Sequence, residues 1–487
     1  MIKKFLKSEK RSPFIFGLAA GLYPVIFYYA TNYTLINSWK HLGFFIALFL
    51  VAPIVSLFVV DKLTKLRSLH RFQHYALPFL NVFLFLFFLH LCLYASVQVW
   101  ISLGLLILAG IIAFFLNKHS KKIVVLQFIL AVIAFVSLVP TVINQLSYSD
   151  EWMILPDDIA EAQFVTKPNV YYIQPDGYVN FSEIEKGYYN IDNTVFKAFL
   201  KTQGFTLYED FRSNYNSTLV SNTAIFSMRH HYHNSGFNFS ETIDGRDIII
   251  TKNAVLDVFK KNGYKTHFFA ESPYLLANHP EIGYDVTNFS LDEISYIGTG
   301  LEVSKEIFDP LKEYIDVETE QPKFFFVEIF KPGHVPSQKA DSKGAEAEKQ
   351  LWIERLQLAN EKLRKTVNII KERDPNALIL IMADHGGYVG MDYMMQMRTR
   401  TEDRDQLFSI FSSQLAIHWP DNKAPRFDNT FKTTVNTFRI LFSYLAQEEK
   451  YLKHLEEDVS FLIVKEGAPK GVYKCIDAEG NIIFEKI

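Results

Sequence analysis

The sequence predicts an N-terminal polytopic α-helical membrane domain of five spans, followed by an α/β domain with a mostly parallel central sheet. Two observations predict this division. Long apolar runs without Asp, Glu, Lys or Arg crowd the first 143 of the 487 residues. Beyond residue 168, short β-rich runs alternate with amphipathic stretches, which is typical of strands connected by helices.

The composition excludes several classes of protein. The chain is 49% hydrophobic, with a mean hydropathy of +0.05, so it is not a disordered chain. Its 50 Lys and Arg residues against 53 Asp and Glu residues leave no basic excess to meet phosphates, and we expect no nucleic-acid partner. Two cysteines, Cys92 and Cys475, are too few for a disulfide framework or a thiolate metal cluster.

The five apolar runs are each long enough, or nearly so, to cross a hydrocarbon core at ~20 residues per helix. A cleaved signal peptide would be one short apolar region, whereas these runs repeat with basic loops between them. A soluble bundle is the alternative, but soluble helices normally keep a polar face. The predicted spans are about 13–31, 41–60, 75–95, 98–116 and 122–143.

The cations next to these spans predict the orientation, because Lys and Arg beside a span resist translocation. They gather in the N-terminal tail and in the second and fourth loops. With five spans, a cytoplasmic N-terminus makes the chain a multi-pass protein of the inner or plasma membrane, with everything after residue 143 outside the cytoplasm. The cations are Lys3, Lys4, Lys7, Lys10, Arg11, Lys62, Lys65, Arg67, Arg71, Lys118, Lys121 and Lys122.

The remaining residues are predicted to form one extracytoplasmic domain. Residues 144–168 are acidic and carry two prolines, so they are expected to be a juxtamembrane linker before a domain at 169–487. Strands and helices then follow in alternation. The expected strands are 170–174, 265–270, 323–330 and 377–383, and the expected helices are about 194–203, 254–261 and 343–373.

Acidic residues directly follow two of these buried strands. Asp176 comes after the first strand, and Asp384 and His385 come after the strand at 377–383. Ligands of open α/β sheets bind outside the carboxyl ends of the strands, so these side chains can meet although they are far apart in sequence. Oxygen ligands with one imidazole suit Zn, Mn or Mg. The alternative for Asp176-Gly177 is an ordinary turn.

A candidate nucleophile lies between these motifs. Thr218 is predicted near the start of a helix that runs toward His230, where free N–H groups and the helix dipole favour an anion. An alcohol is a poor nucleophile at neutral pH, but a divalent cation can deprotonate it. The alternative is that Ser217 or Thr218 merely caps the helix.

Four motifs in this order resemble the sulfatase branch of the alkaline phosphatase superfamily. The resemblance covers roughly residues 168–465, and the five spans extend it to the membrane-anchored lipoteichoic acid synthase and phosphoethanolamine transferase members. It implies a sulfatase-like α/β domain and a metal-dependent hydrolase or transferase of the cell envelope. The motifs are NVYYIQPDGY at 169–178, SNYNSTLVSNTAIFSM at 213–228, KFFFVEIFKPGHVP at 323–336 and ADHGG at 383–387.

The resemblance assigns roles to five residues. Asp176, Asp384 and His385 match metal ligands, Thr218 matches the nucleophile, and His334 matches a histidine that faces the substrate or leaving group. Thr218 is preferred because the family places Ser or Asn three residues later, here Ser221, while Ser217 stays the alternative. One metal ion is expected, since the next histidine, His418, lies in a strand-like segment where it should be packed.

One departure from the family pattern favours phosphorus chemistry. Sulfate-ester hydrolases of this fold use a C/S-x-P-x-R motif, and none occurs near residue 218. We therefore expect a phospho-threonine intermediate formed from a membrane lipid or lipid-linked donor of the phosphoglycerol or phosphoethanolamine type. A cell-surface glycan, a lipid or water would be the acceptor. Lys331 and Arg212 are candidates to contact the anionic group.

Two further readings stay open. The first is a non-catalytic protein that binds envelope polymers on the same fold, although such a module has no need of an aligned nucleophile. The second is a transporter, which the absence of charged residues inside the spans disfavours.

Overall fold

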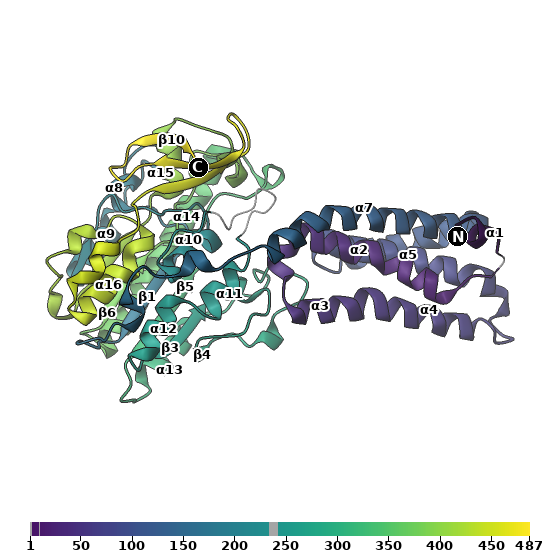
Figure 1. The fold of residues 1–487 in the computed structure, drawn as a ribbon, viewed down its shortest axis with the longest axis horizontal. Helices are drawn as coiled ribbons and strands as arrows, with labels where there is room; N and C mark the ends of the chain where they lie inside the picture. The colour runs from purple at the N-terminus through teal and green to yellow at the C-terminus, as the bar shows by residue number, and fades with distance from the viewer. Residues whose placement is uncertain (1, 9, 233–241) are drawn as a thin grey trace. The chain divides into compact units, whose positions relative to one another are not determined.

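The computed structural model describes residues 2–8, 10–232 and 242–487. The chain divides into two compact units (Figure 1). The first comprises Met1–Tyr148 with Ala277–His279 and Ile294–Glu302. The second comprises Ser149–Leu276, Pro280–Glu293 and Val303–Ile487.

The first unit is helical. In the part of the chain described, four continuous helical stretches are long and apolar enough to cross a membrane, and α6, with 17 residues, is a shorter apolar helix. These five stretches coincide with the five predicted spans. The elements are α1 (Ile2–Lys7), α2 (Pro13–Ile36), α3 (Trp39–Phe45), the π-helix η1 (Ile46–Val51), α4 (Ala52–Leu63), α5 (Gln73–Tyr94), α6 (Val99–Phe115) and α7 (Ser120–Leu146).

Close backbone contact and a buried polar bond hold these helices together. A Cβ atom on Gly21 of α2 would lie 1.5 Å from the carbonyl oxygen of Phe49, so only glycine allows α2 and η1 to approach this closely. The buried Asn81 side chain of α5 donates to the Phe16 carbonyl oxygen at 2.7 Å and to Gln127 Oε1 at 3.0 Å. These bonds satisfy polar groups that the apolar surroundings would otherwise strand.

The second unit is built on a seven-stranded sheet of order β2-β7-β6-β1-β5-β3-β4. Strands β6, β1, β5, β3 and β4 run parallel, and β7 is antiparallel to β6 and to β2. The predicted mostly parallel sheet is confirmed. The strands are β1 (Val170–Pro175), β2 (Phe205–Leu207), β3 (Lys265–Ala270), β4 (Val286–Thr287), β5 (Lys323–Ile329), β6 (Leu378–Met382) and β7 (Leu415–His418).

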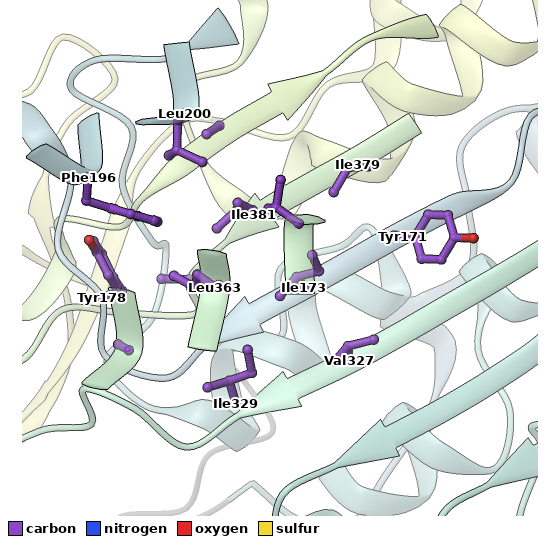
Figure 2. Packing of buried hydrophobic residues seen from close by; sticks show 14 of the residues in the cluster. Tyr171, Ile173, Tyr178, Phe196, Leu200, Val327, Ile329, Leu363, Ile379 and Ile381 are labelled. Atoms are coloured by element: carbon purple, nitrogen blue, oxygen red, sulfur yellow. The ribbon is translucent and has the colours of Figure 1, made fainter. Parts of the chain in front are cut away.

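Helices cover both faces of this sheet. On one face Ile173, Val327 and Ile381 pack against α9 and α14, as Figure 2 shows with Phe196, Leu200 and Leu363. On the other face Tyr172 and Phe326 contact Phe226 of α10, at ring-centroid distances of 6.2 and 5.0 Å. The helices are α8 (Phe181–Ile184), α9 (Thr194–Thr202), α10 (Thr218–Ser227), α11 (Gly245–Ile250), α12 (Ala254–Lys261), α13 (Phe308–Asp316), α14 (Ala345–Arg373), α15 (Arg404–Phe411) and α16 (Thr437–Ala446).

Two segments differ from the local expectations. Residues 159–165, inside the stretch expected as a linker, pack in the second unit: Ile159 is fully buried, and the Phe164 N–H donates to Asn262 Oδ1 at 2.7 Å. At the C-terminus, a three-stranded antiparallel sheet joins β8 (Ser460–Val464), β9 (Gly471–Ile476) and β10 (Ile482–Lys486). This small sheet was not among the elements predicted from the sequence.

Candidate active site

Three predicted ligands converge at the carboxyl ends of two neighbouring strands. Asp176 follows β1, and Asp384 and His385 follow β6, which pairs with β1 in parallel. All three side chains are buried, and one ligand atom from each lies within 4.8 Å of the others. His385 Nε2 is 3.4 Å from Asp176 Oδ1 and 3.4 Å from Asp384 Oδ2. The adjacency of the two strands brings together residues more than 200 positions apart.

Main-chain hydrogen bonds orient these ligands. The N–H groups of Gly177 and His385 donate to Asp384 Oδ1 at 3.3 and 3.1 Å. His385 Nδ1 lies 2.8 Å from the Gly386 carbonyl oxygen, so Nδ1 carries a proton and Nε2 is the nitrogen that faces the carboxylates and would bind a metal ion. Asp384 Oδ2 is buried without a protein hydrogen-bond partner in the described chain.

The electrostatics of the three side chains fit a bound cation. Burial, together with the charge of Asp176, raises the pKa of Asp384 to about 6, although His385 opposes the shift. Burial lowers the pKa of His385, but the Asp384 and Asp176 carboxylates outweigh it and the net shift is upward. Without a cation the cluster therefore holds on to protons. A divalent ion would relieve this repulsion and engage the orphaned Asp384 Oδ2, so the donor set fits Zn, Mn or Mg.

Thr218 lies against the same cluster. It is the first residue of α10, is 9% exposed, and its Oγ1 lies 3.4 Å from both Asp176 Oδ1 and His385 Nε2. Ser217 occupies the N-cap position without a side-chain capping bond, and no hydrogen bond links it to the cluster among the residues described. Of these two hydroxyls, it is that of Thr218 that contacts Asp176 and His385.

His334 stands at the rim of this cluster, on the loop after β5. Its ring centroid is 5.8 Å from those of His385 and Tyr388. Burial lowers the pKa of His334, with Asp176 partly opposing the shift, so the imidazole is neutral near pH 7. Its Nδ1 lies 2.6 Å from the Val335 carbonyl oxygen, which makes Nδ1 the protonated nitrogen and leaves Nε2 as an acceptor.

Two predicted anion contacts are not brought to the cluster by any hydrogen bond of the described chain. Arg212 is buried, and its guanidinium group donates to the main-chain carbonyls of Asp458 and Asp477. Lys331 lies on the His334 loop and is half-buried, with its main-chain N–H donating to the Ile329 carbonyl. His418, expected to be a packed residue, is buried between the Ala377 carbonyl oxygen and Lys371.

Three buried polar side chains, those of Gln174, Asn222 and Glu328, lie one layer below the cluster. Gln174 and Glu328 are register partners on β1 and β5, and all three side chains are fully buried. Thr218 contacts Asp176, and Phe226 contacts Tyr172. Asn222 is midway between Thr218 and Phe226 on α10, as Gln174 is midway between Asp176 and Tyr172 on β1, so Asn222 lies level with Gln174.

Several polar atoms of these three side chains have no protein hydrogen-bond partner in the described chain. They are both side-chain polar atoms of Asn222, both carboxylate oxygens of Glu328, and Gln174 Nε2. Burial, followed by the charges of Asp176 and Asp384, raises the pKa of Glu328 well above its usual range. In the sequence, the one feature that could have indicated Glu328 is that it is a single carboxylate inside the apolar run KFFFVEIF. Like Glu328, Arg355 on α14 was not predicted as a site residue. It is one cation among many on a charged helix, so nothing in the sequence sets it apart.

Comparison with known proteins adds a family. The sulfatase family model matches residues 187–445, and no curated protein sequence matches the chain. The C-terminal periplasmic domain of EcEptC from Escherichia coli is similar in structure, with 13% identity and a TM-score of 0.43, covering 66% of this chain and 96% of that one. The lipoteichoic acid synthase LtaP from Listeria monocytogenes has 11% identity and a TM-score of 0.41, covering 67% and 91%.

Proposed function

This chain belongs to the sulfatase family, and we propose that it is a metal-dependent membrane enzyme that transfers or hydrolyses a phospho-substituent through Thr218. One observation carries the proposal: Thr218 Oγ1 lies 3.4 Å from both Asp176 Oδ1 and His385 Nε2. An alcohol so close to a set of cation ligands can be activated as a nucleophile. A hydroxyl that merely capped α10 would have no reason to point at buried ligands.

The first chemical step forms a bond between Thr218 Oγ1 and phosphorus and breaks the bond from phosphorus to the donor alcohol, which leaves with the proton that the Thr218 hydroxyl gives up. A divalent ion held by Asp176, Asp384 and His385 would lower the pKa of the hydroxyl and offset charge on the phosphoryl oxygens. The N-terminus of α10 adds N–H groups and a positive dipole end beside the same oxygen.

The second step transfers the phosphoryl group from Thr218 to an acceptor. Neutral His334, with Nδ1 directed to the Val335 carbonyl, can accept a proton at Nε2 from an incoming alcohol or water. The bond from phosphorus to Oγ1 then breaks, and Thr218 regains its proton. An alcohol acceptor makes the protein a transferase, and water makes it a phosphodiesterase.

The membrane spans favour a lipid or lipid-linked donor. An active site tethered to a bilayer meets lipid head groups at high effective concentration, which favours a donor of the phosphoglycerol or phosphoethanolamine type. The acceptor would be a cell-surface glycan or a second lipid. We place the catalytic domain outside the cytoplasm of a multi-pass membrane protein, on the strength of the cation distribution.

The experiment is an intact-mass measurement on the full-length protein in detergent, incubated with candidate lipids and with Mn, Zn or Mg. We expect a head-group adduct that requires the metal and maps by fragmentation to Thr218. Ser217→Ala, the matched control one residue away, should retain the adduct, while Thr218→Ala should lose it and keep its bound metal. An adduct on Ser217, or full turnover by Thr218→Ala, would refute the covalent mechanism.

A further inference from the structure

Helix α14 braces the His334 loop with two side chains from one face. Trp352 Nε1 donates to the Gly333 carbonyl oxygen at 2.9 Å. Arg355, three residues later, donates from Nη1 to the His334 carbonyl oxygen at 3.2 Å. The Trp352 bond already fixes the loop next to His334. Because the neutral Trp352 side chain already holds the loop, the positive charge of Arg355 is not needed for that purpose.

Arg355 is a half-buried cation without an ion pair. Its other described bond runs from Nε to the Leu351 carbonyl within the same helix, and none of the described carboxylates pairs with it. Two other partly buried cations of this unit do have carboxylate partners: Lys362 pairs with Glu271, and Arg404 pairs with Glu183. Burial lowers the pKa of Arg355, and the charges of Glu348 and Asp176 oppose that shift only in part, so the half-buried guanidinium has room for a further anion.

The missing partner would lie in a gap that also borders the metal ligands. Gly333 has φ +72° and no side chain, and the point where its Cβ would lie is 3.6 Å from Asp176 Oδ2 and 3.7 Å from Arg355 Nη1. The guanidinium and the first-strand ligand thus face the same small space. A side chain at residue 333 would fill it, whereas glycine leaves it open beside both groups.

We propose that Arg355 binds a non-bridging oxygen of the tetrahedral phosphoryl group on which Thr218 acts, an inference that rests on the proposed function. The planar guanidinium has further N–H donors beyond the two described bonds and matches the geometry of phosphate oxygens. It would hold the phosphoryl group against the cation bound by Asp176. Arg355 is then a substrate-binding residue, and its contact with the His334 carbonyl fixes the direction of the fork.

The test measures the affinity of inorganic phosphate for the metal-loaded, full-length protein in detergent, by calorimetry. We expect Arg355→Gln to weaken phosphate binding between about tenfold and a hundredfold, as for the loss of a hydrogen bond to a charged group. Arg355→Lys should recover part of the affinity, because it keeps the charge without the fork. The matched control is Arg364→Gln, a half-buried arginine on the same helix that donates to the Val195 carbonyl, and it should bind as the wild type does.

Each outcome decides between distinct failures. If Arg355→Gln binds phosphate with wild-type affinity, Arg355 is only a brace and this inference is overturned while the proposed function stands. If the wild-type protein, fully loaded with metal, binds no phosphate at all, the proposed function itself fails. Should Arg355→Gln not fold, Arg355→Lys decides the matter: equal affinity for phosphate in Arg355→Lys and wild type would overturn the assignment of the fork.

Discussion

At the scale of single residues, the site brings together buried polar groups whose burial would be unfavourable without a partner. Asp384 Oδ2 is buried without a protein hydrogen-bond partner in the described chain, and the Thr218 hydroxyl lies beside the buried side chains of Asp176 and His385. Groups that are stranded in this way usually mark a place where a ligand or ion completes the bonding. Buried atoms without a hydrogen-bond partner are therefore as useful for locating the site as those that have one.

Glu328 gives a residue-scale prediction about pH. Because the folded pKa of Glu328 is raised, the folded protein keeps a proton that the unfolded chain releases above a pH of about 4.3. The free energy of unfolding then falls as pH rises, by up to about 1.4 kcal/mol per pH unit. Glu328→Gln removes this term, so we expect it to be more stable than the wild type at pH 7 to 8 and similar near pH 4.

Unfolding of the chelator-treated, full-length protein by heat or denaturant, followed from pH 4 to 8, measures this difference. Glu354→Gln, an exposed glutamate on α14, is the control and should track the wild type across the range. Parallel curves for the wild type and Glu328→Gln would mean that Glu328 is already ionised in the folded protein, with a counter-charge supplied by its surroundings.

At the scale of elements, the site depends on how closely two strand ends approach. The turn after β1 and the loop after β5 are joined by a hydrogen bond from the Gly333 N–H to the Asp176 carbonyl oxygen at 2.8 Å. Gly177 has φ +66°, and a Cβ there would lie 2.3 Å from the Gly333 carbonyl oxygen. Glycine is required here for both its backbone conformation and its lack of a side chain.

Gly177→Ala should therefore separate the two loops. We expect a loss of roughly 2 kcal/mol or more in the free energy of unfolding, from the left-handed backbone and from the clash. The metal content at equilibrium should fall as well, because Asp176 precedes the strained residue. Denaturant unfolding and metal analysis measure the two effects.

Gly263→Ala provides the matched control for that substitution. Gly263 has φ +83°, but its Cβ would meet nothing within 4 Å. Its substitution should lower stability by the backbone cost alone and leave the metal content unchanged. Equal effects of the two substitutions would show that the close approach of the loops is unimportant.

At the scale of the whole molecule, the chain couples a set of apolar helices to a sulfatase-family domain. Among the described residues, four helical stretches are long enough to cross a membrane and a fifth is shorter, and twelve cations lie on the side of the predicted spans that holds the N-terminus. One predicted span, at about 122–143, separates Lys118 from the C-terminal residues, so the two should lie on opposite sides of the membrane.

Labelling intact cells with a membrane-impermeant thiol reagent tests this topology. Glu479→Cys and Lys118→Cys both place a thiol at an exposed position, while the native Cys92 and Cys475 are buried. We expect Glu479→Cys to react in intact cells and Lys118→Cys to react only after lysis. The reverse pattern would place the catalytic domain in the cytoplasm and refute a donor from the outer leaflet.

The sequence by itself determined the features that depend on local patterns. Runs of apolar residues predicted the five helices, and the alternation of β-rich and amphipathic stretches predicted the mostly parallel sheet. The acidic residues after β1 and β6, and a hydroxyl at a helix start, were also visible, because each is set by a few neighbouring residues.

Only the tertiary structure decided which of those side chains meet and what else surrounds them. The contact of the Thr218 hydroxyl with Asp176, the hydrogen bonds of Arg212 to main-chain carbonyls, and the position of Arg355 beside the His334 loop depend on contacts between distant segments. The placement of Asn222 in the same layer as Gln174 and Glu328 also depends on such contacts. Periodicity and motif spacing encode neighbours along the chain, whereas a site is made of neighbours across strands and helices, and packing alone selects those.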